Sequence, residues 1–127
     1  MNDLFFSRYD FTQTREDQNT DYGVQFHIEY AENKKDPAKF RVTIETSVKN
    51  ETESVVVDLE TVGIFTIDRS ADINVSEHLL KENTVAIMLP FIRSQISLLT
   101  TQPGLPPIML PPINVNALLE SSQKEQE

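Results

Sequence analysis

Histidines are the first side chains to test for acid–base chemistry or metal binding. His27 and His78 are the only two in the sequence. His27 falls on the polar phase of a predicted strand, and His78 falls in a predicted surface turn. Both positions are typical of solvated residues rather than of metal ligands. The sequence therefore predicts no metal site and no catalytic histidine.

Carboxylates are more numerous, but their spacing singles out no acid–base pair. Four lie where a wet sheet face would place them: Glu29, Glu45, Asp58 and Glu60. The three glycines are not clustered, which excludes a glycine-rich phosphate loop. The absence of cysteine excludes a disulfide framework and a thiolate metal site. We expect a protein that is not an enzyme and needs no cofactor.

With no catalytic or metal site predicted, the functional signal that remains is a proline-rich stretch within residues 85–119, which could bind peptide. Five of the seven prolines fall between Pro103 and Pro112, interspersed with apolar residues. Such a segment is extended and stiff. Two compatible interpretations remain open: a crossover packed over the edge of the core, or one wall of an apolar groove for an extended peptide. The side chains of that wall would be Leu105, Ile108, Met109 and Leu110.

An amphipathic helix precedes the proline segment. Its apolar residues recur at intervals of three, four and three, which places them on one helix face: Leu89, Ile92, Ile96 and Leu99. The helix could begin at Pro90, but we expect it to begin near Val85, with Thr84 as its N-cap and a kink at Pro90. A short turn over residues 77–82, capped by Ser76, would come before it.

The flanking segments complete the predicted elements. Residues 68–75 form a connection before the short turn. A final helix runs from about Asn114, its N-cap, to Gln123, with Val115, Leu118 and Leu119 facing inward. The polar end of the chain, residues 120–127, is expected to fray.

The first half of the chain predicts strands at residues 4–12, 22–30, 38–49 and 54–67, with the clearest alternation in the second. In the last strand, Val62 and Ile64 fall out of phase with the apolar residues before them. Either a bulge near residues 61–63 or burial on both faces would explain this. Short polar loops between strands predict an antiparallel sheet, and hence an α+β fold.

Length and charge narrow the classes further. The chain has 127 residues, which predicts one domain over residues 1–127, and its formal charge is −9 with a pI near 4.6. This acidity argues against nucleic acids and anionic membranes as partners. We find no signal-peptide pattern and no 18-residue apolar stretch, so we expect a cytoplasmic protein without membrane insertion.

Three motifs in order resemble SecB, the bacterial protein-export chaperone family. They are Gly63-Ile64-Phe65-Thr66-Ile67, Leu89-Pro90-Phe91-Ile92-Arg93, and Leu110-Pro111-Pro112-Ile113-Asn114-Val115-Asn116-Ala117-Leu118. The resemblance covers residues 22–119. The chain is also similar to a shorter, uncharacterised streptococcal-type branch of SecB-like proteins, where we expect it to belong.

The resemblance implies a four-stranded antiparallel sheet, a long helix packed on one side and a short C-terminal helix. It implies a client groove for unfolded polypeptide that is lined on the sheet by Val24, Phe26 and Ile28. It also implies that the motor ATPase SecA would bind an acidic sheet surface, where Val56 and Asp58 lie. Arg8 and Thr12 fall near the acidic positions of the family's first strand, a departure that weakens the case for SecA.

The apolar inventory predicts a homodimer or homotetramer. One sheet and two helices cannot cover both the Leu89/Ile92/Ile96 stripe and the flank formed by Phe91 and Leu98. The resemblance implies long helices at the interface, so we assign the interface to Leu89, Ile92, Ile96 and Leu99. Two functions follow: an ATP-independent holdase, for which the resemblance implies a link to export, or a non-chaperone adaptor or structural protein that binds one folded partner.

Overall fold

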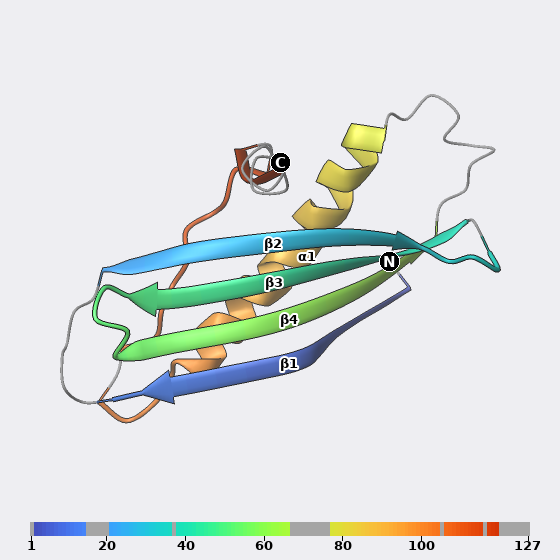
Figure 1. Cartoon of the computed structure of the whole chain (residues 1–127). Coiled ribbons are helices and arrows are strands. Elements are labelled where there is room, and N and C mark those ends of the chain that lie inside the picture. Colours follow the sequence, from blue (N-terminus) through green and yellow to red (C-terminus); the bar gives the residue numbers. More distant parts are fainter. Residues whose placement is uncertain are drawn as a thin grey trace.

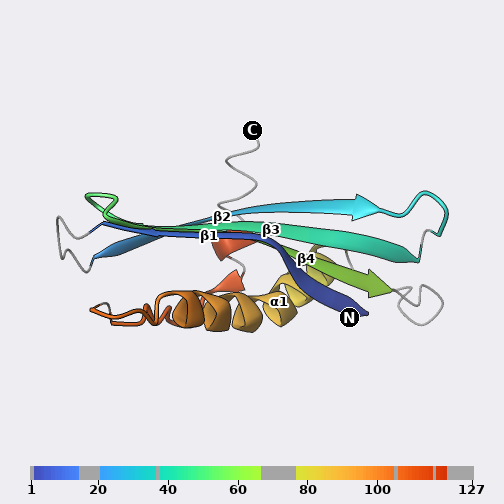
Figure 2. The ribbon, with the colours of Figure 1, turned by 90° about the horizontal axis from the view of Figure 1, so that it is seen from below.

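A computed structural model describes residues 2–14, 21–36, 38–66, 77–104, 106–115 and 117–119, with backbone only for residues 77–79. Its elements are strands β1 (Asp3–Gln13), β2 (Tyr22–Glu32), β3 (Lys39–Asn50) and β4 (Val55–Thr66), followed by helix α1 (Glu77–Leu99). The strands form one antiparallel sheet in the order β1-β4-β3-β2. α1 crosses one face of the sheet diagonally (Figure 1) and makes a second layer beneath it (Figure 2). The predicted α+β architecture is confirmed.

Strand alternation positions the core as the sequence predicts. Side chains of one parity on β3 and β4 are buried under α1, and those of the other parity face the open side of the sheet. Phe40 and Phe65 occupy paired positions, and their rings stack with centroids 5.4 Å apart.

The change of phase in β4 comes from burial on both faces, not from a bulge in β4. Pairing with β3 continues without interruption past Val62, which is only 6% exposed on the open face between Phe5 and Thr43. The bulge lies in the neighbouring strand β1, where the register shifts around Ser7. The Ser7 hydroxyl donates to the Glu60 carboxylate at 2.6 Å, which holds the extra residue against β4.

Gly63 sets how closely α1 approaches the sheet. A Cβ atom at this position would lie 2.9 Å from Sδ of Met88 and 2.8 Å from the Phe65 ring. Met88 is fully buried at this contact. The helix therefore packs against a strand position that only glycine fits without rearrangement.

The start of α1 corrects the sequence prediction. The helix begins at Glu77 and runs through the expected turn without a break, so Thr84 is an interior residue and not an N-cap. The Thr84 hydroxyl donates to the Lys81 carbonyl at 3.0 Å within the helix. Tertiary contacts explain the extra turns: Leu80 packs on the core, and the Lys81 ammonium lies 5.0 Å from the centre of the Tyr30 ring. Pro90 lies inside the helix.

The chain beyond α1 returns along the helix side of the sheet. Gly104 adopts a positive φ of 78°, which suits the turn after the helix. At the C-terminal turn, the Ala117 N–H donates to the Asn114 side chain at 3.1 Å, so the predicted N-cap is confirmed. Leu119 is buried there. The predicted features at residues 68–75, Ser76, the His78 side chain, Leu105 and residues 120–127 lie outside the described residues.

Candidate peptide-binding surface

The long helix presents an apolar ridge on the side away from the sheet. Ile87, Phe91 and Leu98, here called the outer ridge, are 43%, 47% and 67% exposed. Their spacing of four and seven residues keeps them on one side of α1. Several large apolar side chains exposed on one side of a helix make that side a candidate contact site.

The opposite helix side is the chain's own core. Leu89, Ile92 and Ile96 are at most 4% exposed, and Leu99 is partly buried against the same cluster. The side of the helix assigned from sequence to an oligomer interface therefore packs on the chain's own sheet. The flank that the sequence left uncovered, Phe91 and Leu98, is the side that remains available to a partner.

The crossover alternates in burial over three residues. Ile108 and Leu110 are 6% and 8% exposed, whereas Met109 is 76% exposed. Its backbone is tied to α1, because the Ser97 hydroxyl donates to the Ile108 carbonyl at 2.9 Å and Arg93 Nε donates to the Leu110 carbonyl at 3.2 Å. The segment therefore packs over the core, as the first interpretation expected, and holds one apolar side chain out in solvent. The groove-wall interpretation stays a prediction.

On the sheet, the predicted client residues differ in accessibility. Ile28 is 2% exposed and belongs to the core, while Val24 and Phe26 are partly buried against it. Of the six predicted groove residues that the structure describes, Val24, Phe26 and Met109 retain accessible surface. Sequence periodicity could not separate Val24, Phe26 and Ile28, because the three share one strand phase, and it could not rank the three consecutive apolar residues of the crossover.

The open face of the sheet carries charge. Asp10 pairs with Asp58, and Glu45 pairs with Glu60, so like charges lie directly opposite each other across strands. Val56 and Asp58 are partly exposed on this face. Arg8 and Thr12, which mark the departure from the family pattern, lie opposite Glu60 and Val56.

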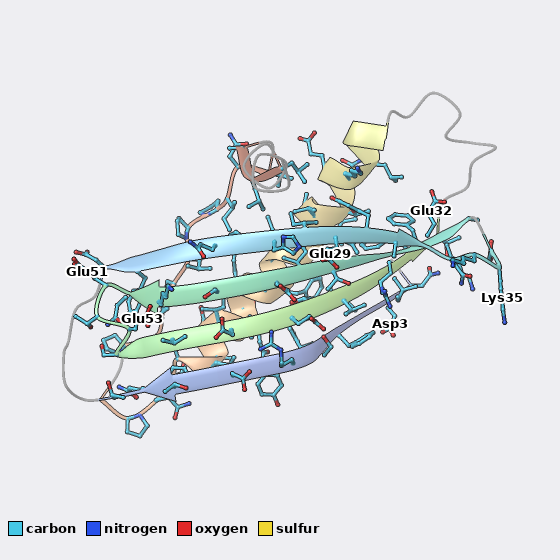
Figure 3. All side chains as sticks on the ribbon, viewed as in Figure 1. Asp3, Glu29, Glu32, Lys35, Glu51 and Glu53 are labelled. Carbon is cyan, nitrogen blue, oxygen red and sulfur yellow. The ribbon has the colours of Figure 1, made fainter. Side chains whose placement is uncertain are left out.

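Further charges lie at the ends of the sheet. Figure 3 shows Glu51 and Glu53 on the β3–β4 turn and Lys35 on the β2–β3 turn. Lys49 and Glu53 form an ion pair at 3.2 Å.

A shallow depression of about 490 Å³ lies beside this pair, lined by Asp21, Tyr22, Gly23, Val24, Gln25, Ser47, Lys49, Asn50, Glu51 and Glu53. Its rim is polar, unlike the apolar surface on the helix side.

Titratable groups do not assemble into a reactive centre within the part of the chain that the structure describes. Nε2 of His27 lies 3.1 Å from the Glu29 carboxylate on the open face. No three histidine, cysteine or acidic side chains there are placed to hold a metal ion. Burial raises the pKa of Tyr30 to about 12, against a smaller opposing effect of its hydrogen bond with Thr84. Tyr30 is thus a structural contact between β2 and α1.

Comparison with known proteins identifies the family of this fold. The family model described as preprotein translocase subunit SecB matches residues 2–126. The chain belongs to the SecB family. The streptococcal-type branch stays a prediction. No helix among the described residues combines the length and apolar character needed to cross a membrane.

Curated SecB relatives are distant in sequence. The protein-export protein SecB of Acinetobacter baumannii is 28% identical over 107 residues, covering 82% of this chain and 70% of the relative. The SecB of Anaplasma marginale is 27% identical over 85 residues, covering 65% of this chain and about half (49%) of the relative. An uncharacterized protein of Methanocaldococcus jannaschii is 29% identical over 115 residues, covering 87% of this chain and 74% of that protein.

A solved structure has the same fold. The SecB-like chaperone of Mycobacterium tuberculosis, in complex with a ChAD peptide from the HigA1 antitoxin, superposes with a TM-score of 0.70 at 19% identity. The match covers 88% of this chain and 85% of that one. Family and neighbour together support a chaperone-type role, in a family that is not enzymatic.

Proposed function

We propose that the protein is an ATP-independent holdase that binds unfolded or extended polypeptide on the helix side of its sheet. The observation that carries this proposal is Met109. It is 76% exposed on a segment whose neighbours Ile108 and Leu110 are buried. A flexible, polarizable side chain held out on a stiff support suits varied apolar clients. Val24 and Phe26 would extend the contact surface on β2.

The outer ridge would bind a second copy of the chain. The ridge residues are exposed on α1 and accessible to a partner: Ile87, Phe91 and Leu98. The SecB resemblance implies long helices at the interface. The surface proposed for self-association is then different from the client surface at Met109. A homodimer or a homotetramer would both use such a self-complementary contact.

The experiment that tests the holdase function compares how the chain binds one client protein in its unfolded and in its native state. A labelled client that is kept unfolded by reduction and carboxymethylation should bind without ATP, and the native form of that client should not. Met109→Ser should weaken binding, whereas Asp36→Ser, a polar substitution on the β2–β3 turn, should not. Equal binding of native and unfolded client, or of neither, would contradict the proposal.

The alternative is an adaptor for one dedicated partner. The Mycobacterium tuberculosis neighbour is in complex with a peptide from one antitoxin, which favours weighing this alternative. A single stable partner from native lysate, together with no binding of unrelated unfolded clients, would favour it. SecA binding at Val56 and Asp58 stays a separate prediction, to be tested by Asp58→Lys in a direct binding assay.

A further inference from the structure

Three hydrogen bonds join the C-terminal end of α1 and the residue after it to the backbone of the crossover. The Thr100 hydroxyl accepts the Ile108 N–H at 2.8 Å, the Ser97 hydroxyl donates to the Ile108 carbonyl, and Arg93 Nε donates to the Leu110 carbonyl. Arg93 and Ser97 lie on α1 and Thr100 directly follows its last residue, and their spacing of four and three keeps the three side chains on one side of the helix end. We call these three residues the clamp. These three bonds all involve main-chain atoms of the crossover, so another extended segment could make the same bonds. One further contact is to a side chain, between the Ser97 hydroxyl and Sδ of Met109 at 3.4 Å.

The segment in the clamp has the pattern of an extended peptide ligand. Its apolar side chains at alternate positions, Ile108 and Leu110, are buried, and the one between them points to solvent. The flanking Pro106, Pro107, Pro111 and Pro112 lack N–H groups and therefore cannot add main-chain donors. An incoming segment without proline would offer more donors than the crossover does.

We propose that the clamp is a binding site for extended polypeptide that the chain's own crossover occupies in the free protein. A client that first contacts Met109 then displaces residues 108–110 from the clamp with a segment that has apolar side chains at alternate positions, and this segment takes over their bonds. Thr100 is fully buried, so its hydroxyl would lose its N–H partner if the crossover left without a replacement. Release of the crossover is thereby coupled to arrival of the client. This inference rests on the proposed holdase function.

A variant that weakens the hold of the crossover on the clamp tests the inference, because peptide affinity should rise if the crossover competes for the site. Ile108→Ala leaves the clamp intact but loosens the crossover, so affinity for a proline-free peptide with Ile-Xaa-Leu repeats should rise about tenfold, because apparent affinity scales with the fraction of free sites. If the crossover serves only as a groove wall, Ile108→Ala should instead bind the peptide more weakly than the wild-type chain. Ile44→Ala, which removes a fully buried isoleucine from the centre of the sheet, controls for general loosening. A similar rise in that variant, or a fall in Ile108→Ala, would overturn the inference.

A reversible lock tests it a second way. The native chain has no cysteine, and the Ser97 hydroxyl lies 3.4 Å from Sδ of Met109. A Ser97→Cys, Met109→Cys double variant can therefore be oxidised to tie the crossover to α1, with the disulfide verified by mass. The oxidised form should bind the peptide at least about tenfold more weakly than the same protein after reduction. Equal affinity in both forms refutes displacement alone, and absence of peptide binding by the wild-type chain refutes the holdase function as well.

Discussion

Serine substitutions at two neighbouring crossover residues should differ strongly in their effect on stability. Ile108 is 6% exposed and Met109 is 76% exposed. Deleting a buried isoleucine side chain costs roughly 2–5 kcal/mol, and the serine hydroxyl would add a buried polar group. We therefore expect Ile108→Ser to lower the free energy of unfolding by about 3 kcal/mol. Met109→Ser should change it by less than about 0.5 kcal/mol, as is usual for surface positions.

Urea denaturation at a fixed protein concentration measures both values. Far-UV circular dichroism reports unfolding of the sheet and helix, and an unchanged m-value shows that the same surface is exposed in each variant. Fixed concentration matters because self-association would contribute to apparent stability. Equal losses in the two variants would refute the alternation of burial along the crossover, and with it the assignment of Met109 as a client contact.

Three further predictions concern the helix and its contacts. Gly63→Ala should destabilise the fold by about 1–3 kcal/mol through overpacking, and Met88→Ala should recover part of that loss in the double variant, as chemical denaturation would show. Phe91→Ser with Leu98→Ser should lower the molar mass measured by light scattering, whereas an unchanged mass would exclude the outer ridge as the interface. The raised pKa of Tyr30 means that the folded state keeps its phenol proton after the unfolded state has lost it, so stability should fall between about pH 10 and 12. Tyr30→Phe should abolish that part of the pH dependence.

Periodicity was sufficient for the sheet because one face of each strand is buried and the other is wet. The helix start could not be obtained in this way. The extra turns from Glu77 are supported by contacts that join distant parts of the chain, such as Lys81 against Tyr30. Val62 shows the same limit, since it is buried on the open face by neighbours on β1 and β3. Local sequence carries no record of such neighbours.

The candidate site was predictable in outline and not in detail. The sequence indicated that α1 carries more apolar surface than one sheet can cover, but not which side the sheet covers. Leu89 and Phe91 are both apolar and two residues apart, so composition cannot rank them, and only docking on the sheet does. The clamp could not be predicted from the sequence, because Ser97 and Thr100 are ordinary polar residues at the end of a helix. Their role depends on tertiary contacts with the crossover.

Suppression of aggregation tests the central claim most directly. Several unrelated proteins would be diluted from denaturant into buffer without nucleotide, and their light scattering followed against increasing amounts of the chain. A holdase of the SecB type should suppress scattering of every client in a dose-dependent way, approaching completion near stoichiometric amounts. Undiminished scattering of all clients at a large excess of the chain would contradict the account.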